Sequence, residues 1–394
     1  MNVAALPPRT LGFTIDAFLD LQQWKPLVLD EAVPMSEVPS CPADRSRLRT
    51  LCTLIERSGK RRVRIGCCAE CGHVTYIDRP TKRWIDEYYR AQWDAHDLTE
   101  RVDKRQDKLA VKLPKEKTGV KIAVGLPVDR SRPVCEIGCG YGANLKHLAN
   151  AGFARLIGTE SSEHRADVVR QVFGFEALTA PFESVETQQS LQTLAPFSII
   201  FSHHVLEHTY HPDEVIAAAS RLQAPGDFLI ISVPNHEQEP SMGVLLFLPH
   251  LHSFTRESLE RLAGRFGYEL HDATYMHPKN VNLAFRRTDA VVNVSVTAGA
   301  FERAVAKYVR VLGLGRRIML PTRLWWNRRA DQAGHVWMAG SGRLEARHWA
   351  RVARRQGLET HRSVKISGLS SRFTTVDESP LEIQFRDDLA LMFK

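Results

Sequence analysis

Three glycines at alternate positions follow a short apolar segment in the middle of this 394-residue chain. Residues 133–137 are predicted to form a strand that runs directly into Gly138, Gly140 and Gly142. A helix is predicted from about residue 143, and the next strand ends at Glu160. Glycines at a turn from strand to helix let the backbone approach a ligand closely and take positive φ values. An acidic residue at the tip of the next strand is suited to accept both hydroxyls of a ribose. The pattern therefore predicts a site for a nucleoside-like ligand.

Strands and helices alternate through the rest of this region. Further strands are predicted at 175–180, 197–202 and 227–233, with helices at 163–173 and 212–222. This alternation is typical of an α/β fold with a doubly wound, mostly parallel sheet. Ligands of such sheets bind at the carboxyl ends of the strands. We expect one site along that edge, where the chain places Gly138, Glu160, Phe182, His203 and Asn235.

The spacing Gly-x-Gly-x-Gly, with Glu136 ahead of it, differs from the dinucleotide fingerprint Gly-x-Gly-x-x-Gly. It resembles the first motif of class I methyltransferases, which use S-adenosylmethionine. The resemblance covers roughly residues 40–275 and implies a seven-stranded, mostly parallel sheet. The cofactor-binding residues that we predict from it are Glu136, Gly138, Cys139, Gly140, Gly142, Asn144, Glu160, Ser161, Phe182, Glu183, Ser202 and His203.

The composition is that of an ordinary globular protein, with 43% hydrophobic and 25% charged residues. The sequence has no run of about 18 apolar residues and no charged segment followed by an apolar block at its start, so we expect neither a membrane span nor a signal peptide. All seven cysteines lie between Cys41 and Cys139. An odd number, with one cysteine in the glycine-rich turn, favours a cytoplasmic location over a disulfide framework.

The net charge of +8 favours an anionic partner, such as a nucleotide-linked sugar, another phosphorylated small molecule or a nucleic acid. A generally basic surface explains the same value. The charge alone therefore does not select a substrate.

Two cysteine-bearing turns precede the predicted sheet. The first contains Cys41 and Asp44, and the second reads Cys68-Ala-Glu-Cys71-Gly. A predicted strand at 62–65 separates them, an arrangement typical of a zinc ribbon. Asp44 stands where a fourth cysteine is usual, and an aspartate oxygen also binds zinc. We predict a structural zinc ion held by Cys41, Asp44, Cys68 and Cys71. Cys52, Cys67 and His73 are further candidates, and free cysteines without metal are the alternative.

This region resembles the zinc-binding domain at the front of many bacterial methyltransferases, including C-methyltransferases of deoxysugar biosynthesis. In those proteins a short segment with tyrosines follows the second turn, and here residues 79–93 contain Tyr88 and Tyr89. The resemblance implies that a tyrosine hydroxyl reaches the substrate, and we name Tyr89 as a candidate catalytic residue. Packing is the alternative role for both rings.

Two histidine-rich segments follow the predicted fourth and fifth strands, and loops at these places roof the substrate pocket in this fold. In one interpretation His250 is a general base, because an imidazole titrates near neutrality. His250 resembles the histidine of a His-x-x-aromatic-Phe-Ser motif in the sugar C-methyltransferases. Phe247, Pro249 and Ser253 depart from that pattern, which disfavours transfer to carbon.

In a second interpretation His204, Glu207, His208 and His252 bind a divalent cation that lowers the pKa of substrate hydroxyls. The spacing resembles the Glu-x-x-Glu-His of metal-assisted O-methyltransferases that act on small-RNA ends and quinone precursors. In a third interpretation, the segment Leu206-Glu207-His208 only shapes the cofactor pocket. The catalytic candidates are accordingly His250, His208, Glu207 and Tyr89.

The length exceeds one methyltransferase core, so we predict several segments. Closing strands are predicted at 280–285, 381–385 and 389–393, and residues 281–394 also contain a predicted helix at 344–356 and the pair Trp325-Trp326 among arginines. A lid, a homodimer surface or closing strands are the roles considered for them. The segments are 1–39, a zinc-ribbon-like domain at 40–98, a linker at 99–125, the core at 126–280 and the C-terminal extension at 281–394. Within the linker, the lysine-rich residues 101–121 are predicted to form a solvated linker or a helix between the domains.

Together these features predict an S-adenosylmethionine-dependent methyltransferase of a small metabolite. We expect O-methylation, and less readily C-methylation, of a sugar or another anionic precursor. One alternative is an RNA methyltransferase with metal-assisted transfer to a 2′ oxygen, although the chain shows no recognisable RNA-binding module. Another is a non-catalytic scaffold that has kept the fold, which the intact glycine-rich turn and Glu160 argue against.

Overall fold

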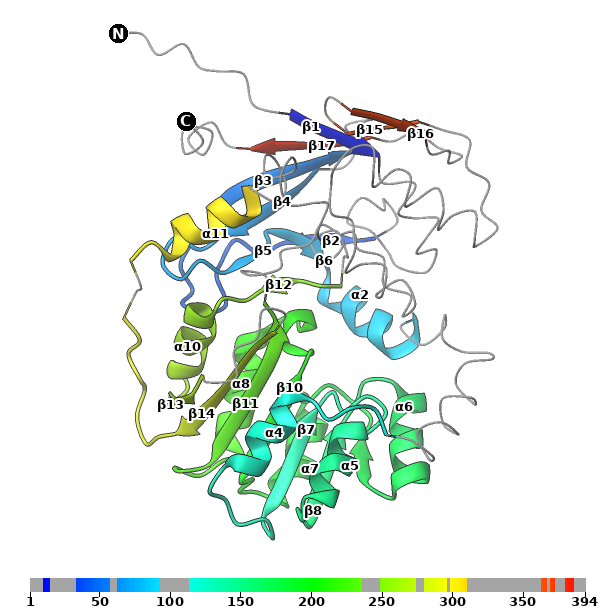
Figure 1. The fold of residues 1–394 in the computed structure, drawn as a ribbon, viewed down its shortest axis with the longest axis vertical. Helices are drawn as coiled ribbons and strands as arrows, with labels where there is room; N and C mark the ends of the chain where they lie inside the picture. Colours follow the sequence, from blue (N-terminus) through cyan, green and yellow to red (C-terminus); the bar gives the residue numbers. More distant parts are fainter. Residues whose placement is uncertain are drawn as a thin grey trace.

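The computed structural model describes residues 10–14, 33–56, 62–92, 113–235, 249–273, 280–295, 298–309, 363–366, 369–372 and 380–385. Two sheets dominate these residues. In Figure 1 an α/β unit (cyan to green) lies below, and a largely N-terminal sheet (blue) lies above it, with helix α2 between the two at one side.

The lower sheet has seven strands in the order β13-β14-β11-β10-β7-β8-β9. Neighbours from β11 to β9 run parallel, whereas β14 runs antiparallel to both β11 and β13. This is the predicted doubly wound α/β class, with seven mostly parallel strands. The strands are β7 (Pro133–Ile137), β8 (Arg155–Thr159), β9 (Glu176–Leu178), β10 (Ile199–His203), β11 (Phe228–Pro234), β13 (Tyr268–Asp272) and β14 (Asn280–Arg287).

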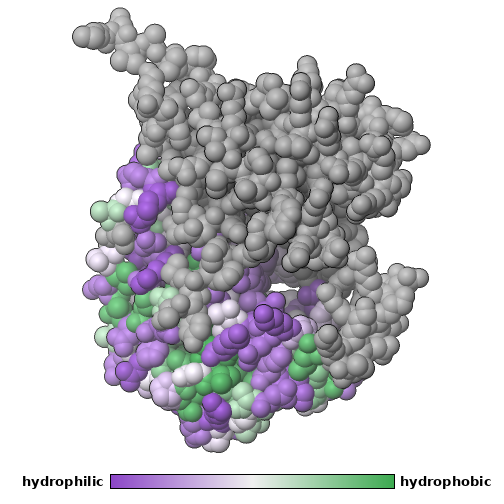
Figure 2. Space-filling view, in the orientation of Figure 1, coloured by the Kyte–Doolittle hydropathy of each residue, from purple (hydrophilic) through white to green (hydrophobic). Residues whose placement is uncertain are grey.

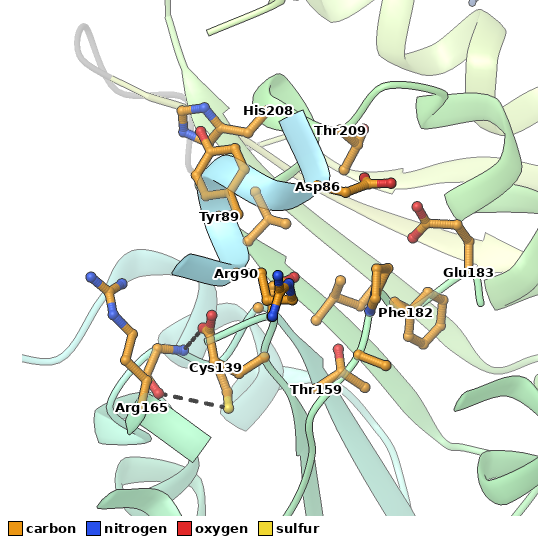
Figure 3. A pocket seen from close by; sticks show the side chains of 18 of the residues that line it. Asp86, Tyr89, Arg90, Cys139, Thr159, Arg165, Phe182, Glu183, His208 and Thr209 are labelled. Carbon is orange, nitrogen blue, oxygen red and sulfur yellow. Dashed lines mark hydrogen bonds between the residues drawn. The ribbon is translucent and has the colours of Figure 1, made fainter. Parts of the chain in front are cut away.

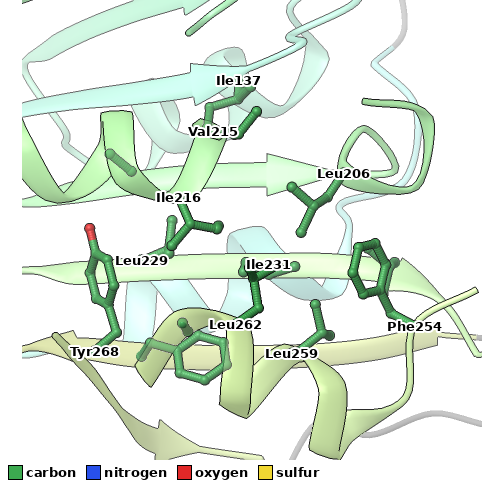
Figure 4. Close-up of a cluster of buried hydrophobic side chains, with 14 of the residues drawn as sticks. Ile137, Leu206, Val215, Ile216, Leu229, Ile231, Phe254, Leu259, Leu262 and Tyr268 are labelled. Carbon is green, nitrogen blue, oxygen red and sulfur yellow. The ribbon is translucent and has the colours of Figure 1, made fainter. Parts of the chain in front are cut away.

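Helices cover both faces of this sheet because successive strand residues point to opposite sides. On β11, Phe228 and Ile230 pack into one cluster and Leu229 and Ile231 into another. Figure 4 shows the second cluster, where Leu259 and Leu262 meet Ile231. The helical segments are α4 (Thr118–Gly125), α5 (Ala143–Asn150), α6 (Glu163–Val168), the π-helix η2 (Val169–Phe173), α7 (Val185–Gln192), the 3₁₀ turn η3 (Leu206–His208), α8 (Pro212–Arg221) and α10 (Arg256–Gly264).

The predicted linker at 99–125 is wrong for its last eight residues. Helix α4 spans them, and Val120 and Ala123 are buried in the sheet's core with Phe201. A Cβ atom added to Gly119 would lie 2.3 Å from the Phe201 ring. The core also extends past its predicted end at 280, because its strand β14 continues to Arg287. Apolar residues between Gly119 and Ala123 drive this packing, whereas the neighbouring lysines suggested a solvated segment.

The upper sheet is antiparallel, in the order β1-β17-β3-β4-β5-β12. Its strands come from three distant parts of the chain, so the predicted 40–98 unit does not form it alone. The elements here are β1 (Thr10–Thr14), β3 (Arg49–Glu56), β4 (Arg62–Cys67), β5 (Val74–Tyr76), β12 (His252–Ser253) and β17 (Pro380–Phe385), with the pair β2 (Met35–Glu37) and β6 (Asp78–Pro80), helix α2 (Lys82–Glu87) and the π-helix η1 (Tyr88–Gln92).

Part of the C-terminal extension returns to this upper sheet. The predicted strand at 381–385 is found as β17, which pairs with β3 rather than with the lower sheet. Helix α11 (Ala300–Val309) contacts the same sheet, with Arg49 4.4 Å from the centre of the Phe301 ring. A hairpin of β15 (Ser363–Ile366) and β16 (Leu369–Arg372) completes the described part. The predicted strand at 389–393, the helix at 344–356 and Trp325-Trp326 lie outside the described residues.

Hydrophilic residues predominate on the part of the core's surface that Figure 2 colours. Among the described residues, the exposed large hydrophobic side chains are those of Val185 and Val291. None of the helices in the described ranges is long and apolar enough to cross a membrane.

Candidate active site

A cavity of about 1090 Å³ opens at the carboxyl ends of β7, β8 and β10. One wall comes from the loops that follow these strands. The opposite wall comes from α2 and η1, including Asp86, Tyr89 and Arg90 (Figure 3). The cavity is therefore built from both the core and the N-terminal region.

The glycine-rich turn forms the cavity floor. Gly138 has a φ of 62°, and a Cβ added to it would lie 2.5 Å from the Val205 side chain. Gly140 has a φ of 55°, and its missing Cβ points into open space. The Gly140 N–H donates to Oε2 of Glu160 at 2.9 Å, and the Ser162 N–H donates to Oε1 at 3.0 Å. These two bonds hold the carboxylate in place at the cavity wall.

Glu136 lies beside this floor with only 1% of its surface exposed. Its Oε1 accepts a hydrogen bond from Asn144 at 2.7 Å, whereas its Oε2 has no hydrogen-bond partner among the described residues. Burial raises the pKa of Glu136 to about 8. An orphaned acceptor in a cavity wall fits a ligand that brings a donor, such as the amino group of S-adenosylmethionine.

Ten of the twelve predicted cofactor-binding residues line the cavity. Gly142 does not, because it caps α5 and its missing Cβ faces Val169 at 3.0 Å. Ser202 does not either, since it is buried within β10, where its Oγ has no hydrogen-bond partner in the described part of the chain. The residues in the wall are Glu136, Gly138, Cys139, Gly140, Asn144, Glu160, Ser161, Phe182, Glu183 and His203.

Several cavity residues were missed by sequence reasoning. Asp86 and Arg90 come from the segment singled out for its tyrosines, and a helix through that segment would have brought them to the same site. Arg165, Thr209 and Tyr210 follow predicted elements closely but carry no motif of their own. Only the assembled cavity identifies them.

A buried carboxylate surrounded by imidazoles lies behind the cavity. Glu207 is 1% exposed, and its Oε1 lies 3.2 Å from Nδ1 of His204, 3.8 Å from Nε2 of His208 and 3.9 Å from Nε2 of His250. Burial acts to raise the pKa of Glu207, but the close contact with His204 and the charges of His208 and His204 outweigh it. The pKa of Glu207 is therefore below its ordinary value.

His208 is the member of this group that connects the carboxylate to the cavity. It lines the cavity with 20% of its side chain exposed. Its Nδ1 lies 3.1 Å from the carbonyl oxygen of Pro249, to which Tyr89 also donates at 3.4 Å. The Tyr89 and His208 rings are 5.5 Å apart between centroids (Figure 3).

His250, which one interpretation of the sequence predicts to be a general base, does not line the cavity. It is 9% exposed and packs behind His208, with ring centroids 4.8 Å apart. His204 does line the cavity, and it adopts a left-handed backbone with a φ of 55°. Burial, followed by the charge of His204, lowers the pKa of His203 to about 3, so this imidazole is neutral at physiological pH.

The prediction of His252 as a cation ligand beside Glu207 is wrong. His252 is fully buried elsewhere, with its Nδ1 3.1 Å from Nε2 of His73 and its Nε2 3.1 Å from the carbonyl oxygen of Thr209. Both ring nitrogens are therefore engaged. The three residues whose ligand atoms lie within 4.8 Å of one another are Glu207, His208 and His250.

The cysteine-bearing turns bring Cys41, Asp44, Cys68 and Cys71 together, with all four ligand atoms within 4.8 Å of one another. The Sγ atoms of Cys41 and Cys71 are 3.7 Å apart, and Sγ of Cys68 lies 3.4 Å from Oδ2 of Asp44. The further candidates do not join them: Cys67 Sγ faces the Cys68 carbonyl, His73 pairs with His252, and the side chain of Cys52 is outside the described part.

Comparison with known proteins agrees with this geometry. Residues 95–273 match the family model described as "Methyltransferase domain". The chain is 25% identical over 166 residues to the ubiquinone biosynthesis O-methyltransferase of Nitrosococcus oceani, a match that covers 39% of this chain and 70% of that protein. It is 25% identical over 176 residues to the same-named protein of Thiobacillus denitrificans, covering 41% and 75%.

Two solved structures from Burkholderia thailandensis are similar at a lower level. An O-methyltransferase family protein gives a TM-score of 0.39 at 15% identity, covering 51% of this chain and 64% of that chain. A 1,6-didemethyltoxoflavin-N1-methyltransferase with bound S-adenosylhomocysteine gives a TM-score of 0.40 at 15% identity, covering 56% and 98%.

The strand order, the glycine-rich turn facing Glu160 and the matched methyltransferase domain define one class of protein. The protein is an S-adenosylmethionine-dependent methyltransferase, and its methyltransferase domain, matched over residues 95–273, has the class I fold.

Proposed function

We propose that the protein transfers the methyl group of S-adenosylmethionine to a hydroxyl oxygen of a small acceptor, and that His208 removes the acceptor's proton. The observation that carries this proposal is the environment of the His208 ring. A carbonyl oxygen only accepts hydrogen bonds, so the contact with Pro249 puts the proton of the neutral imidazole on Nδ1. Nε2 then keeps a lone pair for the proton of a hydroxyl.

Glu207 supports that proton transfer electrostatically. Once Nε2 has taken a proton, the ring is positively charged and lies 3.8 Å from Oε1 of Glu207. The lowered pKa of Glu207 keeps this buried carboxylate ionised at neutral pH. Charges of opposite sign attract strongly where little water lies between them. The pair therefore stabilises the state in which the acceptor has lost its proton.

The methyl group of S-adenosylmethionine is attached to a sulfonium, and S-adenosylhomocysteine is a good leaving group when the methyl is transferred. The protein's contribution is therefore mainly to orient the reactants. We propose that the carboxylate of Glu160 receives the ribose hydroxyls, and that Glu136 and the turn at 138–140 hold the amino-acid end. The Tyr89 ring lies next to the His208 imidazole in the cavity wall, just below it in Figure 3. Its hydroxyl donates to Pro249, and burial raises its pKa, so we assign it to shaping the site rather than to accepting a proton.

For the acceptor we favour a phenol that also carries a negatively charged group, such as a carboxylate or a phosphate. A phenol, with an ordinary pKa of about 10, gives up its proton to an imidazole more readily than a sugar alcohol does. The two relatives are named as O-methyltransferases of ubiquinone biosynthesis. Lys82, Arg83 and Arg90 stand in the cavity wall, where Lys82 pairs with Asp86 at 2.8 Å and Arg90 pairs with Glu87 at 2.7 Å. Arg83 is therefore the cation that we assign to a carboxylate or phosphate on the acceptor. A nucleotide-linked sugar is the second class to test.

The test follows labelled methyl transfer to 3,4-dihydroxybenzoate and to UDP-glucose. His208→Ala should lower turnover about 10²–10⁴-fold, the usual contribution of a general base, and leave the affinity for S-adenosylmethionine unchanged. His211→Ala is the matched control, because His211 is a nearby histidine that does not line the cavity. Full turnover in His208→Ala would reject the assignment of the base.

A divalent cation at Glu207, His208 and His250 is the second way in which this cluster would activate a hydroxyl. Two imidazoles and one carboxylate make a donor set suited to zinc or a similar transition metal. The two roles of His208 exclude each other, because a ligand's lone pair is not available to a proton. Dialysis against EDTA, with the zinc content of the protein followed, distinguishes them. Loss of turnover that added metal restores, while the zinc at the cysteine group is retained, supports the cation, and unchanged turnover supports the base.

We also propose that Cys41, Asp44, Cys68 and Cys71 hold a structural zinc ion. Ligands 2.3 Å from a tetrahedral zinc stand roughly 3.8 Å apart, and the Cys41 and Cys71 sulfurs are separated by 3.7 Å. Protein purified without chelator should contain one zinc per chain, which Cys71→Ala should remove. Cys67→Ala, a change at a buried neighbour outside the group, should retain it. A wild-type protein without zinc would reject this proposal.

A further inference from the structure

The two loops that carry the Glu207 cluster are both bonded to the N-terminal region. The first loop follows β10 and contains η3, with Glu207 and His208, and ends near Tyr210. The second loop contains residues 249–255, from Pro249 through β12. Neither loop belongs to the seven-stranded sheet, so their positions depend on what they touch.

His252 is the side chain through which these contacts pass. It lies in β12, which pairs with β5 so that His252 is opposite Thr75. Its Nε2 must donate to the Thr209 carbonyl oxygen, because a carbonyl cannot donate. Its Nδ1 is then the acceptor for Nε2 of His73. One buried ring thus joins the N-terminal sheet, the second loop and the residue that directly follows His208.

Other buried polar contacts hold the same loops but reach them at different points. Thr75 Oγ1 donates to the Leu251 carbonyl at 2.8 Å, and Thr255 Oγ1 donates to the Cys71 carbonyl at 3.0 Å. Arg79 donates to the Tyr210 carbonyl at 3.3 Å. These three bonds hold the loops at Leu251, Thr255 and Tyr210. The bond from His252 differs from them because it reaches Thr209, the residue next to His208.

We propose that His252 is a positioning residue for methyl transfer, which keeps His208 aligned through its hydrogen bond to Thr209. This inference rests on the proposed role of His208 as the base. His208 itself is oriented by Pro249, two residues before Leu251. His252 therefore holds the 3₁₀ turn that carries His208 in its position relative to the Pro249 carbonyl, which orients the His208 ring. The N-terminal region is by this argument part of the catalytic arrangement and not an attached module.

The test compares substitutions that keep or remove the donor. His252→Leu removes the bond to Thr209 while it still fills space, and His252→Gln keeps an amide N–H at a similar reach. We expect His252→Leu to lower turnover with 3,4-dihydroxybenzoate about 10–10²-fold, since a small misplacement of a reacting group has effects of this size. Affinity for S-adenosylhomocysteine should change less than twofold, and His252→Gln should recover most of the turnover.

His147→Leu is the matched control, because the Nε2 of His147 also lies against a carbonyl oxygen, that of Pro114, at 2.8 Å, away from the cavity. If His252→Leu does not fold, His252→Asn replaces it, since its shorter amide does not reach Thr209. A second readout needs no acceptor: ¹⁵N–¹H spectra of the imidazoles should show the Nδ1 proton of His208 in the wild type and in His252→Gln, and a mixture of tautomers in His252→Leu.

An unchanged His208 tautomer and unchanged turnover in His252→Leu or His252→Asn would overturn the positioning role. A loss of cofactor affinity equal to the loss of turnover would also overturn it, as that result indicates general damage. Failure of the proposed function looks different. In that case His208→Ala itself keeps its turnover, whatever the result at His252.

Discussion

At the scale of single residues, the site depends on which side chains reach the cavity and which remain behind them. The sequence indicated His208, His250 and Glu207 as candidates, and all three meet in the structure. It could not show which of them reaches the cavity, because exposure is set by the path of two loops that a local pattern does not encode. His250 is 9% exposed behind His208, so the more accessible ring becomes the candidate base.

Glu160 offers a direct residue-scale prediction. Glu160→Gln replaces one carboxylate oxygen with an NH2 group, which cannot accept a hydrogen bond from the Gly140 or Ser162 N–H. The loss of one charge-assisted hydrogen bond is worth about 1.5–3 kcal/mol, so calorimetry should find S-adenosylmethionine bound roughly 10–100-fold more weakly. Glu186→Gln, at an exposed position on α7, is the control and should bind normally. Unchanged affinity in Glu160→Gln would place the cofactor elsewhere.

Glu136 predicts a dependence of stability on pH. Its pKa is about 8 in the folded protein, above the ordinary value near 4.5. Between these values the folded state binds more protons than the unfolded state, so the free energy of unfolding falls as the pH rises from about 4.5 to about 8. One such group contributes at most about 1.4 kcal/mol per pH unit. Urea unfolding of the cofactor-free protein should show this slope.

The matched variant for that measurement is Glu136→Gln, which keeps the acceptor for Asn144 but cannot titrate. Its stability should decline less with pH than that of the wild type over the same window. Parallel curves for the two proteins would contradict the raised pKa of Glu136.

At the scale of elements, the strands and helices of the core were predictable because their apolar periods are strong. The strand predicted at 197–202 is found at Ile199–His203, and the helix predicted at 212–222 is found at Pro212–Arg221. A helix was one alternative for the lysine-rich stretch at 101–121, but the packing of helix α4 (Thr118–Gly125) on the sheet was not predicted, because the lysines indicated a solvated segment. Its buried face becomes clear only when Phe201 is seen beneath Gly119.

Two glycines of α4 test that packing. Gly119→Ala puts a methyl group against the Phe201 ring and should cost about 1–3 kcal/mol, as overpacked cores do. Gly125→Ala, in the same helix, meets nothing within 4 Å and should be neutral or stabilise by up to about 1 kcal/mol. Thermal unfolding measures both. Equal melting temperatures would mean that α4 does not pack on the sheet.

At the scale of the whole molecule, the division into successive segments was too simple. β12 pairs with β5, and β17 pairs with β3, so the upper sheet draws on residues from the core and from the C-terminal extension. Pairing between such distant segments cannot be recognised from the local sequence, because each strand is short. Its partner is determined by how the intervening residues fold. The consequence is functional: α2 and η1 of the N-terminal region form one wall of the cavity that the core opens.

The central claim is that cofactor and base meet in this shared cavity. The measurement that tests it most directly is a crystal structure of the protein with S-adenosylhomocysteine. We predict that the ribose hydroxyls contact the carboxylate of Glu160 and that the sulfur faces the space beneath His208 and Tyr89. A cofactor bound away from Glu160, or a sulfur separated from His208 by protein atoms, would contradict the account.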